Sequence, residues 1–346
     1  MFNSLQIENF GIFDRLDWQE HGQINVLIGE TDTGKTYLLK LLYCLAKSLE
    51  DYSKRQQSDR PSWKEVLAEK LFWVYQPDDR KLGTLVKKGE KRLNVEANLF
   101  ETKLSFYLNQ DATRKISQAA DIHLPSQPMN VLFIPPEEIL TAMDAIAATR
   151  DSLKIFGFDD TYQDLIHALR VPRSQQDLPK SLQNILQTLE TLVNGTISQE
   201  DHKFILRRGE ETFAMSQTAE GIKKLGIFTT LIQNQTLKPG TILILDEPEV
   251  NLHRQALRAF TKLLFNLAQV DIQIYLATHS YVVVKQLEIL ARKHQYRIPI
   301  CSLTKGDRNP QIISQFGNLQ EGMPDNPIID ASIDLYEEEV RLELES

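Results

Sequence analysis

The chain is poor in cysteine and has no long apolar run, and each absence narrows its class. Cys44 and Cys301 are the only cysteines among 346 residues, and they lie far apart within apolar stretches. A disulfide framework is therefore excluded, and we expect two buried thiols in a reducing compartment. No apolar run reaches the roughly 18 residues that span a bilayer, and the start of the chain lacks the pattern of a signal peptide. We expect a cytoplasmic protein without a membrane partner.

Charge is distributed unevenly along the chain. Residues 318–346 hold nine acidic residues and one arginine, a balance that equals the net charge of −8 of the whole chain. Residues 54–115 hold 14 lysines and arginines against nine acidic residues. This asymmetry is compatible with one basic surface that meets a polyanion such as DNA, although most charge runs are simply solvated faces. The sequence leaves both interpretations open.

Two details of these charged segments lead to structural expectations. If DNA is a ligand, the cations of the basic segment that would contact its phosphates surround a predicted turn near Gly89; they are Lys87, Lys88, Lys91 and Arg92. In the acidic segment, apolar residues recur at partly helical spacing: Ile328, Ile329, Ile333, Leu335, Tyr336, Val340 and Leu342. The pattern predicts an amphipathic helix whose apolar stripe packs on the rest of the chain or on a partner protein.

The order of strand and helix patterns predicts an α/β fold. The segments LQIENF, INVLIG and NVLFI predict strands, and the second is followed by the helical run KTYLLKLLYCLAKSLE. Residues 82–108 predict an antiparallel meander, residues 137–195 predict helices, and KFILRRGEETFAMS predicts a hairpin. Four later strands, TILILDEP, IQIYLATHS, IPICSLT and PQIISQF, are separated by helical stretches. The sequence has no internal repeat, low-complexity segment or long heptad run.

A glycine-containing motif lies between a predicted strand and a predicted helix. The segment GETDTGKT, residues 29–36, matches the phosphate-binding pattern G-x-x-x-x-G-K-[ST]. Its glycines let backbone N–H groups point at phosphate oxygens, and the helix N-terminus adds partial positive charge. We expect Lys35 to reach the β- and γ-phosphates and the Thr36 hydroxyl to ligate Mg²⁺. The predicted nucleotide-contacting residues are Gly29, Glu30, Thr31, Asp32, Thr33, Gly34, Lys35, Thr36 and Tyr37.

Two later strands also end in residues that suit phosphate chemistry. The segment TILILDEP ends an apolar strand in two adjacent carboxylates, which is costly unless they face a cation or water. Asp246 suits a contact to Mg²⁺, and Glu247 suits polarising the attacking water. The segment IYLATHS places His279 at another strand end, where its side chain suits contact with the γ-phosphate. These residues predict ATP hydrolysis with Mg²⁺.

These motifs resemble the ABC-type P-loop ATPases of the SMC, RecF and OLD-nuclease kind. The resemblance rests on LQIENFGIFDRLDW, GETDTGKT, ILILDEPEVNLH and LATHS, and it covers roughly residues 1–48 and 200–305. It implies an ATP-binding head with a mixed core sheet, an antiparallel β subdomain and a helical lobe. The implied division of the single head is a core from residues 1–50 and 200–316, an inserted segment 51–136 with antiparallel strands, a helical lobe 137–199 and an acidic tail 318–346.

The resemblance also implies a homodimer in which two heads meet head-to-tail around two ATP molecules. Each γ-phosphate would then meet a signature segment of the other head, which corresponds here to MSQTAEGIKKLG with Gly221 as its glycine. The usual serine two residues earlier is Ala219, so its hydroxyl contact is absent unless Ser216 compensates. The Asn-Gly pair usual in the phosphate loop is replaced by Thr31 and Asp32.

Three further roles implied by the resemblance are less defined. Glu137 or Glu138 in FIPPEEIL would stand for the glutamine of the lid segment, which has no clear match. His253 would face the partner head or serve only the fold. Phe13 would stack on adenine or belong to the core.

The remainder of the chain narrows what the ATPase drives. Residues 49–200 lack the long paired heptad arms of SMC proteins. The segment after IPICSLT is too short for the metal-binding domain of OLD nucleases. The LSGGQ signature of transporter ATPases is also missing. We therefore expect an ATP-driven switch that acts on a separate effector protein or on DNA, in DNA repair or anti-phage defence. The alternatives are an ATP-sensing scaffold with negligible turnover and the ATPase subunit of a transporter.

Overall fold

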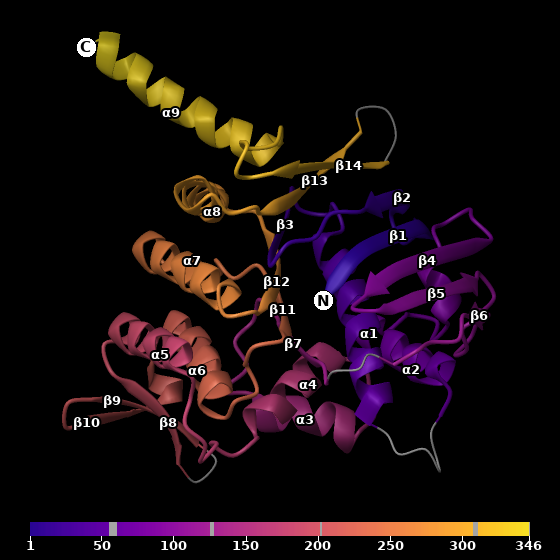
Figure 1. Ribbon diagram of the computed structural model, residues 1–346, viewed down its shortest axis with the longest axis horizontal. Helices are drawn as coiled ribbons and strands as arrows, with labels where there is room; N and C mark the ends of the chain where they lie inside the picture. The colour runs from indigo at the N-terminus through magenta and orange to yellow at the C-terminus, as the bar shows by residue number, and fades with distance from the viewer. Residues whose placement is uncertain (55–60, 125–127, 201–202, 307–310, 346) are drawn as a thin grey trace.

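The computed structural model describes residues 1–54, 61–124, 128–200, 203–306 and 311–345. Its centre is a six-stranded sheet in the order β14-β13-β3-β12-β11-β7 (Figure 1). Five strands are parallel, and β14 runs antiparallel to its neighbour β13, so the core sheet is mixed as expected. The strands are β3 (Ile24–Gly29), β7 (Asn130–Ile134), β11 (Thr241–Asp246), β12 (Gln273–Thr278), β13 (Pro299–Lys305) and β14 (Ile312–Asn318).

A second, antiparallel sheet has the order β2-β1-β4-β5-β6. The expected antiparallel pairing within residues 82–108 is confirmed, but the predicted position of the turn is wrong. The chain reverses at Phe100 and Glu101, whereas Gly89 lies in a turn that precedes the hairpin. The segment before Gly89 also contains a short helix, η2 (Leu82–Leu85), in place of a strand. The strands of this sheet are β1 (Phe2–Phe10), β2 (Phe13–Trp18), β4 (Arg92–Leu99), β5 (Thr102–Asn109) and β6 (Gln118–Ala119).

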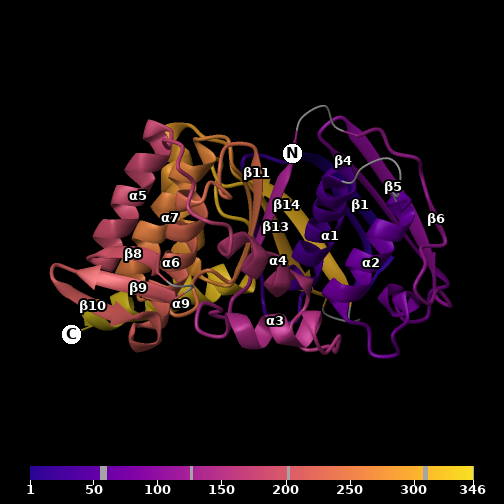
Figure 2. The same cartoon turned by 90° about the horizontal axis from the view of Figure 1, so that it is seen from below.

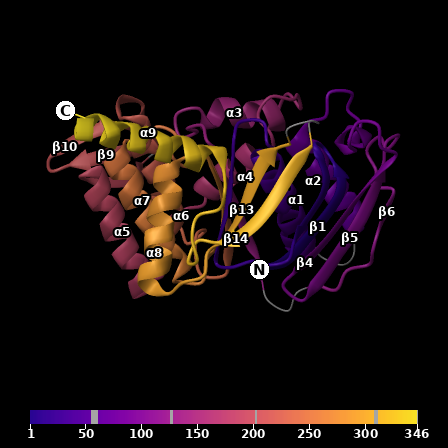
Figure 3. The same cartoon turned by 90° about the horizontal axis from the view of Figure 1, so that it is seen from above.

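Both faces of the six-stranded sheet are covered, which explains why its inner strands are buried throughout and mostly apolar. Leu243 and Leu245 of β11 belong to one core, and Ile242 and Ile244 between them belong to another. Helix α1 (Lys35–Lys54) lies between the two sheets, with α2 (Trp63–Tyr75) packed beside it (Figure 2). Helices α7 (Arg254–Ala268) and α8 (Tyr281–His294) cover the opposite face (Figure 3).

The region between β7 and β11 contains the expected hairpin. Strands β9 (Lys203–Arg208) and β10 (Glu211–Ala214) pair across Gly209, and β8 (Thr196–Glu200) completes a three-stranded sheet. Two short helices precede α5 in this region: α3 (Met143–Asp151) and α4 (Asp160–Leu169). Helices α5 (Lys180–Val193) and α6 (Glu220–Gln233) pack against each other, and the short helix η3 (Met215–Gln217) leads into α6.

Strand pairing crosses the predicted boundaries at three strands. β1 and β2, which the sequence assigned to the nucleotide-binding core, pair within the antiparallel sheet. β7, which the sequence assigned to the inserted segment, pairs with β11 in the core sheet. These pairings could not be read from order along the chain because β1 and β4 are more than 80 residues apart.

The acidic tail contains the expected helix, α9 (Pro327–Glu345). Its first turn is anchored because Ile329 is 3% exposed, whereas Leu335 and Tyr336 are 70% and 65% exposed. Beyond the first turn the helix projects from the body of the molecule (Figure 1). The side chains of Glu339, Glu343 and Glu345 lie outside the described part of the chain, as do Arg55 and Arg60 of the basic segment.

Both cysteines are buried free thiols, as expected, and burial raises the pKa of Cys301. Across the described ranges, no helix combines the length and the apolar character needed to cross a membrane.

Candidate functional site

The GETDTGKT loop connects the end of β3 to α1 and encloses its own lysine. Lys35 Nζ donates hydrogen bonds to the carbonyl oxygens of Gly29 and Glu30, at 2.6 and 2.8 Å. Burial lowers the pKa of Lys35, an effect that the charges of Glu247 and Asp246 oppose. Gly34 has a φ of +85°, which favours glycine. The ammonium group is therefore held inside the loop, where a nucleotide phosphate would find it.

Thr36 and Asp246 meet across adjacent elements. The Thr36 hydroxyl on α1 donates a 2.7 Å hydrogen bond to Asp246 Oδ2 at the end of β11. Burial raises the pKa of Asp246 to about 6, and the bond from Thr36 opposes that shift. The other carboxylate oxygen, Oδ1, is buried and has no hydrogen-bond partner among the residues that the structure describes. A hydroxyl and a carboxylate with one unused oxygen fit a hard cation such as Mg²⁺ that keeps several waters.

The donor set is small, because the described residues contain no group of three or more His, Cys, Asp and Glu side chains that could hold a metal. A cation here would therefore depend on phosphate oxygens and water for its remaining ligands. The site residues fit Mg²⁺ carried with a nucleotide better than a metal held by protein alone.

Glu247 and His279 lie beside this pair. His279 Nδ1 is 3.3 Å from Glu247 Oε1, and His279 follows directly after β12, which pairs with β11. Glu247 has a φ of +45°, uncommon for a residue with a side chain, and its N–H donates to the Ala277 carbonyl. Strained backbone of this kind is often found at functional sites. The structure thus brings together the loop, Asp246, Glu247 and His279 at one edge of the sheet.

The sequence reasoning missed two buried residues near this edge. Glu249 Oε1 accepts hydrogen bonds from the Thr278 hydroxyl and the His279 backbone N–H, at 2.7 and 2.9 Å. Lys224 of α6 donates to the Val250 carbonyl, and burial lowers its pKa to about 8 against the opposing charge of Glu249. The only signals in the sequence were the second glutamate of DEPE and the lysine pair of GIKK.

The two glutamates proposed for the lid segment point to different partners. Glu137 is exposed and pairs with the Tyr162 hydroxyl, and the pKa of Tyr162 is raised mainly by burial, with smaller contributions from Glu137 and Asp246. Glu138 accepts hydrogen bonds from the backbone and hydroxyl of Thr141. Glu137 is therefore the better placed of the two for contact with a nucleotide-bound cation or water.

The proposal that Phe13 stacks on adenine is contradicted by its burial. Phe13 is 1% exposed and packs in the core, where a Cβ on Gly34 would lie 2.7 Å from its ring. Ile12 beside it is 36% exposed and also adjoins Gly34. Tyr37 packs its ring on Phe10 and Tyr75, so among its atoms the backbone is best placed to meet a ligand. The contact between Phe13 and Gly34 explains why the Phe13 ring points into the core.

The two residues proposed to face a second head lie near the loop after β11. Gly221 is in the first turn of α6, where a Cβ would lie 2.9 Å from the Asn251 carbonyl oxygen. The N-cap residue Ala219 provides no side-chain hydrogen bond, and Ser216 is exposed in η3. His253 caps α7 through Nδ1, which accepts from the Ala256 N–H at 3.4 Å. His253 therefore has a clear role in the fold.

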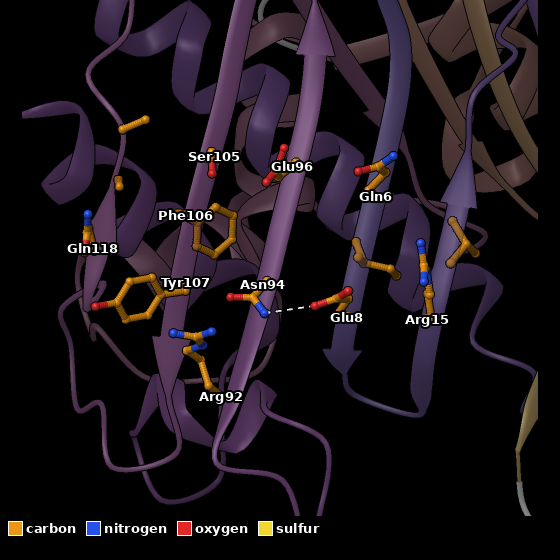
Figure 4. A pocket seen from close by; sticks show the side chains of 14 residues that line it. Gln6, Glu8, Arg15, Arg92, Asn94, Glu96, Ser105, Phe106, Tyr107 and Gln118 are labelled. Carbon is orange, nitrogen blue, oxygen red and sulfur yellow. Dashed lines mark hydrogen bonds between the residues drawn. The ribbon is translucent and has the colours of Figure 1, made fainter.

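A separate hollow of about 390 Å³ lies on the outer face of the antiparallel sheet (Figure 4). Arg15 and Arg92 lie on either side of it, with Glu8 and Asn94 between them, and the Arg92 guanidinium lies 5.0 Å from the Tyr107 ring centre. Of the four cations proposed for DNA, Lys87 pairs with Asp14. Lys88, Lys91 and Arg92 form no ion pair with any described residue. Gly89 remains among these cations, although the hairpin turn is elsewhere.

Comparison with known proteins gives one family match and two kinds of relatives. Residues 134–285 match the family described as "AAA domain, putative AbiEii toxin, Type IV TA system". Among curated proteins, the DNA replication and repair proteins RecF of Bacillus cereus (strain G9842) and Bacillus thuringiensis (strain Al Hakam) are each 29% identical over 140 residues. The match covers 40% of this chain and 32% of each relative, so it spans about a third of their length.

Two solved structures of SMC heads share the fold. One is a head bound to the C-winged helix domain of ScpA, with a TM-score of 0.54, 12% identity and coverage of 91% of this chain and 97% of that chain. The other is a Pyrococcus furiosus head with an extended coiled coil bound to the C-terminal domain of ScpA, with a TM-score of 0.51, 10% identity and coverage of 97% and 98%. In fold and motifs the chain resembles the ABC-type P-loop ATPases of the SMC and RecF group.

Proposed function

We propose that the protein binds and hydrolyses ATP with Mg²⁺ and works as a switch on a partner protein or on DNA, in DNA repair or anti-phage defence. One observation carries this proposal. The Thr36 hydroxyl and the loop-held Lys35 at the start of α1 meet the half-satisfied Asp246 carboxylate and Glu247 at the end of β11, at one edge of the sheet. Such convergence of phosphate-binding and acidic groups suits phosphoryl transfer to water.

The residues divide the work by position. The loop N–H groups and Lys35 bind the β- and γ-phosphates, while Thr36 and Asp246 hold Mg²⁺, which when bound offsets phosphate charge. Glu247 is half-buried, with a side chain 32% exposed, so it can face a water molecule and accept its proton. His279 is 50% exposed and presents its Nε2 side to the ligand, because Nδ1 faces the carboxylates.

Assembly of two heads completes the proposed switch. The half-exposed N-terminus of α6 at Gly221 carries N–H groups without helix partners, and such groups suit a phosphate from a second copy. Gly221 itself is a poor test position because any side chain there meets the Asn251 backbone. Ala219 is exposed and is the N-cap, so it accepts substitution without that clash.

The test compares Ala219→Asp with Ala219→Ser in the Glu247→Gln background, using light scattering with and without ATP. Both new side chains cap α6, so both variants should fold at least as well as the parent. The serine variant should dimerise with ATP, whereas the carboxylate of the aspartate variant should repel the γ-phosphate and keep the protein monomeric. Equal masses for both variants and the parent, with and without ATP, would remove the head-to-tail dimer from the proposal.

The effector is proposed to be a separate protein, DNA, or both. Lys88, Lys91 and Arg92 are exposed and have no carboxylate partner among the described residues, which supports contact with phosphates. The RecF relatives are named for DNA replication and repair. The exposed apolar residues Leu335 and Tyr336 of the acidic helix α9 support docking to a protein.

A second candidate function is an ATP-sensing scaffold with negligible turnover. It is favoured by Ala219, which offers no hydroxyl at the place where the signature segment would meet a phosphate. Steady-state phosphate release separates the two functions, because a scaffold binds ATP and dimerises without releasing phosphate.

A further inference from the structure

Glu249 stands next to the proposed reaction centre without a role in it. Its side chain is 8% exposed, compared with 32% for Glu247 and 50% for His279. A buried carboxylate is costly unless its oxygens are paired. One of the two oxygens of Glu249, Oε2, is buried and has no hydrogen-bond partner within the described part of the chain. Packing alone does not explain why a carboxylate stands at position 249.

The paired oxygen holds the segment that carries His279. Glu249 Oε1 accepts a 2.7 Å bond from the Thr278 hydroxyl and a 2.9 Å bond from the His279 N–H. The same oxygen is 3.5 Å from Nδ1 of the His279 ring. The Thr278 oxygen in turn accepts the Ser280 N–H, at 3.0 Å. One carboxylate oxygen thus ties the loop after β11 to the first residues beyond β12.

The two carboxylates near His279 differ in how firmly they are held. Glu247 has a side chain that must turn toward water when it acts as a base, so its 3.3 Å approach to Nδ1 cannot be permanent. Glu249 is fixed by hydrogen bonds from the Thr278 hydroxyl and the His279 backbone N–H. Lys224 also lies near it: the charge of Glu249 raises the pKa of Lys224, although burial has the larger, opposite effect. Only Glu249 can keep Nδ1 facing inward throughout a reaction cycle.

We propose that Glu249 is a positioning residue for His279, which it holds through Oε1 so that Nδ1 faces the protein and Nε2 faces the γ-phosphate. This inference deepens the proposed function and rests on it for the identity of the ligand. In general, a carboxylate or carbonyl that contacts one ring nitrogen of a histidine fixes the orientation and the tautomer of the ring. Glu249 itself touches no ligand, so its effect is expected on the rate more than on ATP affinity.

The test uses Glu249→Leu, which keeps the size of the side chain and removes the acceptor, and Glu249→Gln, which keeps an acceptor oxygen. Nitrogen-15 histidine spectra of the nucleotide-free proteins report the ring of His279, assigned by loss of its signals in His279→Gln. The wild-type spectrum should show Nδ1 protonated. Glu249→Leu should move the ring signals toward those of free histidine, whereas Glu249→Gln should retain them.

The kinetic measurement on the same variants should show a divided effect. The kcat of Glu249→Leu should fall by about 10- to 100-fold, the usual cost of removing a residue that orients a reacting group. The KM for ATP should change little, because the phosphate loop is untouched. The kcat of Glu249→Gln should remain within about threefold of the wild-type kcat, since the glutamine side chain keeps an acceptor oxygen. Glu288→Gln serves as control, because Glu288 is buried in α8 and pairs with Lys285 and Arg292 away from the site.

Unchanged His279 signals together with unchanged kcat in Glu249→Leu would overturn the proposal. If that variant fails to fold, Thr278→Val carries the test, because it removes the hydroxyl that holds Glu249 and should shift the same signals in the same direction. Unchanged signals in Thr278→Val would then overturn it. Absence of ATP hydrolysis in the wild type would refute the proposed function alone, since the spectra read the position of His279 without nucleotide.

Discussion

Two regions present charged side chains in opposite ways. One is the edge of the core sheet that holds the proposed nucleotide site (the nucleotide edge), and the other is the antiparallel sheet with the cations at the start of β4 (the outer sheet). At the nucleotide edge, Lys35 and Asp246 are 6% and 3% exposed, and each is tied to another element by hydrogen bonds. In the antiparallel sheet region, Lys88 and Lys91 lie just before β4 and Arg92 begins it, and all three are exposed and make no ion pair with the described residues.

The difference predicts how each region responds to change. Charges in a buried, low-dielectric site interact strongly and specifically, whereas exposed charges act together and are screened by salt. Substitution at the nucleotide edge should therefore cause large effects that depend on the residue. Substitution on the outer sheet should cause small effects that add up and fade as salt rises.

The largest effect is expected from Lys35→Ala. The substitution removes the buried positive charge from the phosphate loop and also leaves the Gly29 and Glu30 carbonyls without their donor. ATP affinity should fall by about 1000-fold, ~4 kcal/mol. Isothermal titration of ATP with Mg²⁺ measures this loss. Affinity within a few-fold of the wild type would show that the loop does not bind phosphate.

The next effect concerns stability without ligands, and its sign follows from the raised pKa of Asp246. The folded-state pKa of about 6 lies above the reference value of 3.8, so the folded protein binds more protons between these values. The favourable contribution of protonated Asp246 is complete below pH 3.8 and is lost as pH rises through 6. Asp246→Asn should therefore be more stable than the wild type at pH 7.5 by up to about 3 kcal/mol.

Urea denaturation of both proteins in EDTA, at pH values between 4 and 8, measures this difference. The advantage of Asp246→Asn should vanish toward pH 4, and addition of Mg²⁺ with ATP should reverse it. Lys88→Ala on the outer sheet is the matched control and should change stability by less than about 0.5 kcal/mol at any pH. A constant difference at every pH would show that Asp246 is not strained by its burial.

The smallest effect is expected on the outer sheet. Reversal of the charges of Lys87, Lys88, Lys91 and Arg92 should weaken DNA binding by about tenfold at low salt, whatever the DNA sequence. Lys87 should contribute least because it pairs with Asp14. Fluorescence anisotropy over a range of salt concentrations reports the affinity and its salt dependence. Salt-independent binding, or no binding at low salt with ATP, would leave a protein as the better partner.

The parts of this fold that were predictable are those encoded locally. The phosphate loop, the strand-end acids and the hairpin at Gly209 depend on residues adjacent in sequence, so spacing alone predicted them. The hairpin turn at Phe100 was missed because Phe100 adopts a left-handed φ of 53° without a glycine. The sequence left open whether Phe13 is buried, because its burial depends on contact with Gly34, on the other side of β3 in sequence.

Glu249 shows the same limit within the site. Its partners, Thr278 and His279, lie about 30 residues away and reach it only because β11 and β12 are neighbours in the sheet. The sequence indicated that both strands end in polar residues, but not which acid faces which donor. The two glutamates of DEPE differ in burial, and this difference is a property of the folded loop.

The rate of ATP hydrolysis by Glu247→Gln tests the central claim most directly. The amide keeps the size of the side chain and cannot accept a proton from water, so the kcat should fall by about 100-fold or more while ATP affinity stays within about threefold of the wild type. That result would establish Glu247 as the base of an ATPase whose binding site is intact. Hydrolysis at the wild-type rate by Glu247→Gln would contradict the account.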